Sequence, residues 1–241
     1  GTITNWNGAT MTAWNGTNAG WQSGTITNLN SGIIELVQTG NTITNMKGGT
    51  VQSMTDGNIG TITGGTVDSM TGGLIGLING GDVTAATGGN ITELRTGSIG
   101  TLDTDLAFMT GGTITLVDDN GVVGEQRGGI ITTIDGLLTT LTNGTVRFVN
   151  GRIATMNGGL VDSVNSTGIV DVMNNGKSTA MDGLVSSMTG GTIGNVTGTV
   201  TSATGGDINK VSATGTINNM NGAHIVETTG TIDEINSGLV D

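Results

Sequence analysis

Cysteine and proline are absent from this chain of 241 residues, and aromatic side chains are scarce. The absence of cysteine excludes disulfide bridges, thiolate metal sites and thiol nucleophiles. The absence of proline, beside 46 glycines, excludes a collagen triple helix and a proline-rich linker. With three tryptophans, two phenylalanines and no tyrosine, the side chains are small on average.

Charge is also scarce and mostly negative, with 19 acidic residues against 7 basic ones and a net charge of -12. A basic patch for nucleic acid is therefore not expected. Apolar residues come one or two at a time between glycine, threonine and asparagine, so neither a membrane-spanning segment nor a signal peptide is expected. Because the chain begins with Gly1 and not methionine, we expect a fragment or a processed form.

A repeat of seven or eight residues runs along most of the chain, with the pattern Gly-x-(Ile/Val)-x-x-(Met/Leu/Ile/Val)-x-Gly. The second aliphatic position follows the first by three residues. The step is eight residues in the middle of the chain and then alternates between seven and eight. The predicted core comprises Ile43, Val51, Ile59, Val67, Ile75, Val83, Ile91 and Ile99 at the first position, with Met46, Met54, Met70 and Leu94 at the second.

The composition of the repeat favours strands over helices. Each glycine costs a helix about 0.8 to 1 kcal/mol relative to alanine, and nearly every unit contains one or two. Valine, isoleucine and threonine suit a pleated strand, while Gly-Gly and Asn-Gly supply the positive φ angles of tight turns. One unit buries too little apolar surface to fold alone, so the units must stack. The sequence therefore predicts an all-β protein, an elongated β-solenoid of strand-and-corner units.

The repeat of seven or eight residues, the octad, is part of a longer repeat of two units. Units with valine at the first position carry a small residue two positions later. These small residues are Ser53, Ser69, Ala85, Ser163 and Ser187. Units with isoleucine carry longer or polar residues there. The pattern predicts a coil of two units, 15 to 16 residues long, with a crowded face and an open face. We expect the crowded, small-residue face to mediate association into a homo-oligomer, a trimer.

Glycine-containing octads with one β-branched residue at a fixed place, from about residue 24 to 241, resemble the β-helical shafts of tailed-phage tail fibres and cell-puncturing spikes. The chain resembles more loosely the β-roll heads of trimeric adhesins. The shafts of that family are obligate trimers in which three chains wind around one axis. Such winding predicts a sequence feature that recurs every three units, whereas the alternation of valine and isoleucine units in this chain recurs every two units. We therefore expect coils closed within one chain, and the three-chain intertwined β-helix is the alternative.

The three tryptophans lie together at Trp6, Trp14 and Trp21, in the place that methionine and leucine hold in later units. They predict either a stacking platform for sugar rings or well-sealed first coils, residues 1–23, that form a cap or junction before the shaft at 24–241. Phe108 and Phe148 stand where other units have small or polar residues, and we expect them to be local packing plugs.

Few residues of the sequence suggest metal binding or catalysis. Asp118, Asn120 and Glu125 resemble a calcium loop, but their spacing is poor, and a nine-residue step at this place favours an insertion at a corner. The single histidine, His224, has no thiol partner, and a Ser-His-Asp triad is not expected. The sequence therefore predicts no catalytic residue, no cofactor and no metal beyond this weak calcium candidate.

Together these features predict a non-enzymatic structural shaft of an extracellular fibre, a phage tail fibre or spike on the virion surface. The alternative is a surface adhesin or carbohydrate-binding β-solenoid that binds a cell-surface glycan or receptor. Ice binding is a weaker alternative, because the Thr-x-Thr pairs that flank Ile3, Ile26 and Ile43 do not persist in later units.

Overall fold

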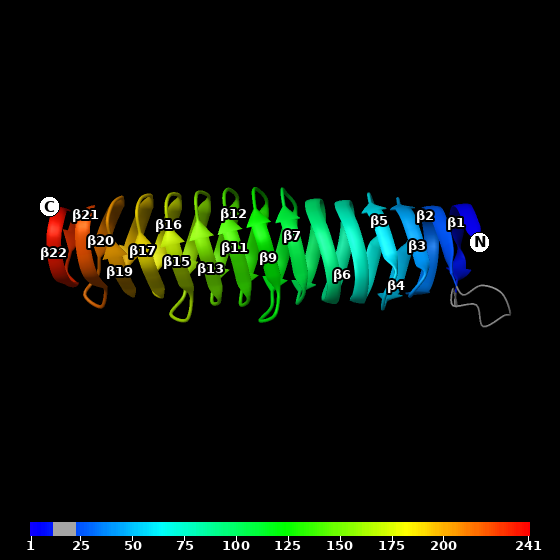
Figure 1. Cartoon of the computed structure of the whole chain (residues 1–241), viewed down its shortest axis with the longest axis horizontal. Helices are drawn as coiled ribbons and strands as arrows, with labels where there is room; N and C mark the ends of the chain where they lie inside the picture. Colours follow the sequence, from blue (N-terminus) through cyan, green and yellow to red (C-terminus); the bar gives the residue numbers. More distant parts are fainter. Residues whose placement is uncertain (12–22) are drawn as a thin grey trace. The chain divides into compact units, whose positions relative to one another are not determined.

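The computed structural model describes residues 1–11 and 23–241, which form two compact units, residues 1–122 and 123–241. The described residues contain strands and no helix. Each unit is a parallel β-solenoid, and the coils of both units together number about 14 (Figure 1). The predicted all-β solenoid is therefore confirmed.

The first unit contains β1 (Thr2–Met11), β2 (Gly24–Val37), β3 (Asn41–Met46), β4 (Thr50–Met54), β5 (Asn58–Ile62), β6 (Thr66–Leu102), β7 (Asp105–Met109) and β8 (Thr113–Val117). β9 (Val122–Gln126) begins at the division between the units. The long strands β2 and β6 continue through corners, so each of them contributes to more than one side of the solenoid.

The second unit continues with β10 (Ile130–Ile134), β11 (Leu137–Leu141), β12 (Thr145–Val149), β13 (Arg152–Met156), β14 (Leu160–Val164), β15 (Ile169–Met173) and β16 (Lys177–Met181). It ends with β17 (Leu184–Met188), β18 (Thr192–Val196), β19 (Thr199–Ala203), β20 (Asp207–Val211), β21 (Thr216–Thr228) and β22 (Thr231–Val240).

Each coil consists of two strand segments of the same chain, because a segment pairs with the second segment after it and not with the next one, and the long strands contain more than one segment. In the second unit, β12, β14, β16, β18 and β20 form one column, and β13, β15, β17, β19 and β21 form the other. Equivalent core residues stack in register within a column, as Val146 does with Val161 and Ile153 with Val170. The predicted coil of two units, closed within one chain, is confirmed.

The core follows the predicted spacing of three. In a typical strand such as β4, the second and fifth residues, Val51 and Met54, are completely buried, and the two residues between them face outward. All of the residues predicted as core are buried. Stacked coils therefore form a mostly aliphatic interior in each unit, interrupted in the second unit by the buried Gln126 and Ser178. This interior supplies the burial that one octad lacks.

Corner length explains why the repeat changes from eight residues to alternating seven and eight. Most corners of the first unit contain three residues between strands, such as Thr63–Gly65 between β5 and β6. In the second unit one side of the coil often turns in two residues, such as Asp135–Gly136 between β10 and β11. The strands β10 to β20 all have five residues, as β4 and β5 do, so the corners and not the strands change the period.

The prediction of one small-residue face is wrong for the second unit. Ser163 lies on β14, in the column of β12 and β16, whereas Ser187 lies on β17, in the other column. In the first unit Ser53 does pair with Ser69. Nor is that side more crowded, because Ser69 and Thr61, which occupy the same strand position in different columns, are both half-buried. Valine and isoleucine fit either column, so their alternation does not mark a face.

Candidate binding surfaces

Trp6 occupies a core position of the first coil. It pairs with Leu29 of the next coil, is half-buried, and its indole Nε1 is buried without a hydrogen-bond partner. Trp14 and Trp21 lie outside the described residues, as do all of residues 12–22 of the predicted first coils, 1–23. The sugar-stacking platform and the separate first domain therefore stay predictions.

The calcium candidates Asp118 and Asn120 belong to a four-residue corner. The Gly121 N–H donates to the Asp118 carbonyl at 2.7 Å and closes the turn. The Asp118 side chain accepts from the Asp119 N–H at 3.0 Å, and the Asn120 N–H donates to Asp103 Oδ1 at 3.3 Å. The predicted insertion at a corner is confirmed.

Glu125, the third calcium candidate, is held by neighbours in the second unit. Its carboxylate accepts from Arg127 Nη2 at 2.6 Å and from Thr142 Oγ1 at 2.9 Å. The Arg127 hydrogen bond, and after it that of Thr142, lowers the pKa of Glu125. Across residues 1–11 and 23–241, no group of three or more histidine, aspartate or glutamate side chains is arranged to hold a metal ion.

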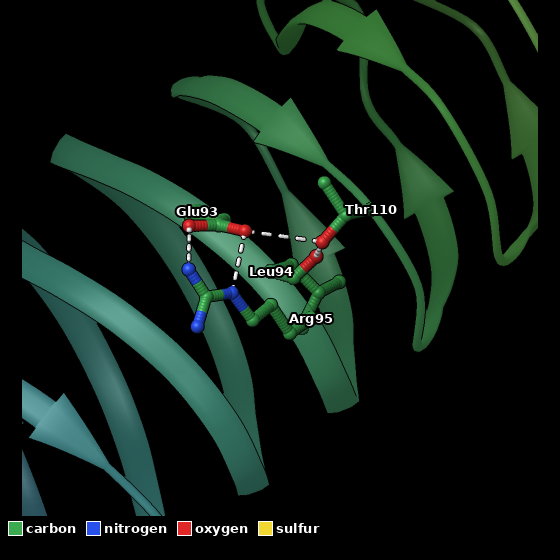
Figure 2. Close-up of polar contacts among 4 residues, drawn as sticks. All are labelled: Glu93, Leu94, Arg95 and Thr110. Atoms are coloured by element: carbon green, nitrogen blue, oxygen red, sulfur yellow. Dashed lines mark hydrogen bonds and ion pairs between the residues drawn. The ribbon is translucent and has the colours of Figure 1, made fainter.

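A polar clasp joins neighbouring coils of the first unit at Glu93, Arg95 and Thr110 (Figure 2). Arg95 Nε donates to Glu93 Oε1 at 2.7 Å, and Arg95 Nη2 donates to Oε2 at 3.1 Å. Thr110 Oγ1, from the next coil, donates to Oε1 at 3.1 Å. The hydrogen bonds and charge of Glu93 raise the pKa of Arg95. This clasp orients the corner that follows the buried Leu94.

The same clasp recurs in the second unit with Glu125, Arg127 and Thr142. In both clasps the threonine follows the glutamate by 17 residues, so that it lies at the corresponding corner one coil later. The signal in the sequence is Glu-x-Arg with a threonine at that distance, and our sequence analysis missed it. Both arginines are more than half exposed, so each clasp contributes little to stability and mainly sets local geometry.

The two phenylalanines are not packing plugs. Phe108 pairs in register with Glu93 and is 40% exposed, and Phe148 is 45% exposed. Both occupy the fourth position of a five-residue strand, which faces away from the core. The first unit therefore presents an exposed aromatic ring beside a carboxylate, an arrangement that the sequence analysis did not foresee.

His224 lies between two carboxylates of the second unit. Its Nδ1 is 3.3 Å from Asp207 Oδ1 in the preceding coil, and its Nε2 is 3.0 Å from Asp241 Oδ2 in the following one. Hydrogen bonding to Asp241, and less strongly to Asp207, raises the pKa of His224. The arrangement is an ion-pair ladder across three coils.

A groove of about 420 Å³ lies beside the corner 165–168 of the second unit. Its polar lining residues are Ser166, Thr167, Asp182 and Thr199, and three glycines also line it. Its apolar part consists of Ile169 and Leu184, both half-buried. Because its residues come from three successive coils, the groove is visible only once the register of stacking is known.

No known protein family, curated protein or solved structure matches this chain. In the described part of the chain, no helix is long and apolar enough to cross a membrane.

Proposed function

We propose that this chain is a non-enzymatic shaft segment of an extracellular fibre, such as a phage tail fibre or spike. The observation that carries the proposal is the parallel, in-register stacking of equivalent core residues from coil to coil in each unit. A coil of this kind contacts only its neighbours, so adding coils extends the structure without changing the fold. That property suits a spacer between a particle and its target.

The outward surface is consistent with a spacer. Hydrogen bonds between adjacent coils repeat along it, as from Asn165 Nδ2 to Asn150 Oδ1 and from Asn150 Nδ2 to Asp135 Oδ1. The ion pairs Arg152–Asp171 and Lys210–Glu227 also join adjacent coils. These contacts link coils to one another, as a mechanical role requires.

A surface adhesin or carbohydrate-binding solenoid is the second candidate, and the exposed ring of Phe108 beside Glu93 favours it. Ice binding has weaker support. Thr2, Thr25 and Thr42 align in register on the first three coils, but Asn58 takes the corresponding place on the fourth.

Immunogold electron microscopy of intact particles that contain this chain tests the shaft proposal. Antibodies against this chain are expected to label thin fibres that project from the particle, and preimmune serum provides the control. Labelling confined to the particle interior, or to cell lysate without any fibre, would contradict the proposal.

A further inference from the structure

We propose that the groove beside the corner 165–168 binds one or two rings of a neutral saccharide. This inference goes beyond a shaft role and does not depend on it. It rests on the groove's shape and lining, which follow from the different lengths of three neighbouring corners.

The groove arises because a long corner is followed by two short ones. The corner at 165–168 contains four residues and is closed by the Gly168 N–H, which donates to the Asn165 carbonyl at 2.8 Å. The next two corners of this side contain two residues each, Asp182–Gly183 and Thr197–Gly198. The long corner therefore projects beyond them, and Figure 1 shows it as a yellow loop at the lower edge.

Glycine keeps the recessed corners low. A Cβ on Gly183 would collide with the carbonyl oxygens of Gly168 and Asn165, and one on Gly198 would collide with that of Gly183. No side chain can therefore rise from these two positions into the groove. A ligand would lie against peptide backbone there, whose N–H groups at Gly183 and Gly198 already donate to the carbonyls of Val164 and Met181.

The projecting corner is held in place before any ligand arrives. Asn165 Nδ2 donates to Asn150 Oδ1 at 2.5 Å, and Ser163 Oγ donates to Asn165 Oδ1 at 3.0 Å. Asn150 is bonded in turn to Asp135 at 2.7 Å. Such preorganisation reduces the entropy cost of binding.

The lining suits a polyhydroxylated ligand. Three hydroxyls can both donate and accept, and the Asp182 carboxylate, which accepts from Thr197 Oγ1 at 3.2 Å, can accept further hydrogen bonds from sugar hydroxyls. The half-buried Ile169 and Leu184 offer apolar contact for the C–H face of a sugar ring. A volume of about 420 Å³ lies in the range of small-molecule sites.

Charge decides between neutral and acidic ligands. The lining contains one carboxylate and no lysine, arginine or histidine. An anionic sugar would meet the Asp182 charge without a compensating cation, which is unfavourable. We therefore expect neutral saccharides to bind and sialylated ones to be rejected.

A printed array that carries maltotriose, chitotriose and sialyllactose tests the proposal, followed by titration of the protein with any saccharide retained. The purified chain is expected to bind a neutral saccharide and not sialyllactose. Thr167→Leu, which removes a hydroxyl and fills the groove, should weaken binding at least tenfold. Asp182→Asn, which keeps the acceptor for Thr197, should weaken it several-fold.

Thr214→Leu is the matched control, because Thr214 takes the same place in another four-residue corner, 212–215, but does not line the groove. Its affinity should equal that of the unchanged protein, and circular dichroism should show all variants folded. Retention of no saccharide, preference for sialyllactose, or equal loss in Thr214→Leu would each overturn the proposal. None of these outcomes bears on the immunogold test of the shaft.

Discussion

Gly65 and Gly81 stack directly at one corner of the first unit, both with positive φ, of 86° and 74°. A Cβ on Gly81 would lie 2.6 Å from the carbonyl oxygen of Gly65. Glycine is therefore required twice, once for the backbone conformation and once for the close approach of the coils. The recurrence of glycine in the repeat follows from this contact.

Gly81→Ala should lower the free energy of unfolding by about 2 to 4 kcal/mol, because it combines a strained φ with a clash against backbone. Thr84→Ala, on the exposed surface of the same coil, should change it by less than about 0.5 kcal/mol. Urea denaturation followed by circular dichroism measures both. Equal stability of the two variants would show that the corner relaxes at no cost.

Val67→Asp should cost several kcal/mol, because Val67 is fully buried and an unpaired carboxylate would enter the aliphatic interior. Thr115→Asp places the same charge at an outward position and should leave the melting temperature nearly unchanged. Thermal melts compare the two. An unchanged transition for Val67→Asp would contradict the core assignment.

Ser178→Val should stabilise the protein by about 1 kcal/mol. Ser178 occupies a core position between Val161 and Ile193 and is 1% exposed, and its hydroxyl makes only one hydrogen bond, of 3.3 Å, to the Ala180 carbonyl. Valine would complete the aliphatic row without changing the backbone. Ser178→Ala separates lost polarity from gained packing and should give a smaller increase in the urea midpoint.

The raised pKa of His224 makes the ladder with Asp241 and Asp207 dependent on pH. Its stabilising contribution is complete below the ordinary pKa of 6.5 and is lost as the pH rises through the raised value of the folded state. Wild type should therefore exceed His224→Gln in stability more at pH 5.5 than at pH 9. An NMR titration of the imidazole gives its pKa directly, and a value at or below 6.5 would refute the ladder.

Ser69→Phe tests lateral association in the first unit. If copies of the chain associate through the Ser53 and Ser69 side, the larger ring should reduce the mass measured by light scattering. Thr61→Phe is the control, because it places the same ring at the equivalent position of the other column. Identical masses for wild type and both variants would exclude this side as an interface.

The spacing of aliphatic residues within one octad was enough to predict which side chains are buried, as at Val51 and Met54. Whether a side chain points inward depends on the local geometry of one strand and its corner, and both are written in consecutive residues. The coil of two strands was predicted from another pattern, the alternation of valine and isoleucine units, although that alternation does not mark a face in the second unit. Residues that depend only on their own octad were therefore predictable.

The clasp of Glu93, Arg95 and Thr110, the columns of Ser163 and Ser187, and the groove beside residues 165–168 were decided by the tertiary structure. Each depends on which residues lie above one another in neighbouring coils, and that register is the accumulated result of corners of two, three or four residues. The exposure of Phe108 was missed because its size suggested burial, whereas its strand position turns it outward. The spacing of residues within one octad determined which side chains are buried. The stacking of coils determined which side chains contact one another on the surface.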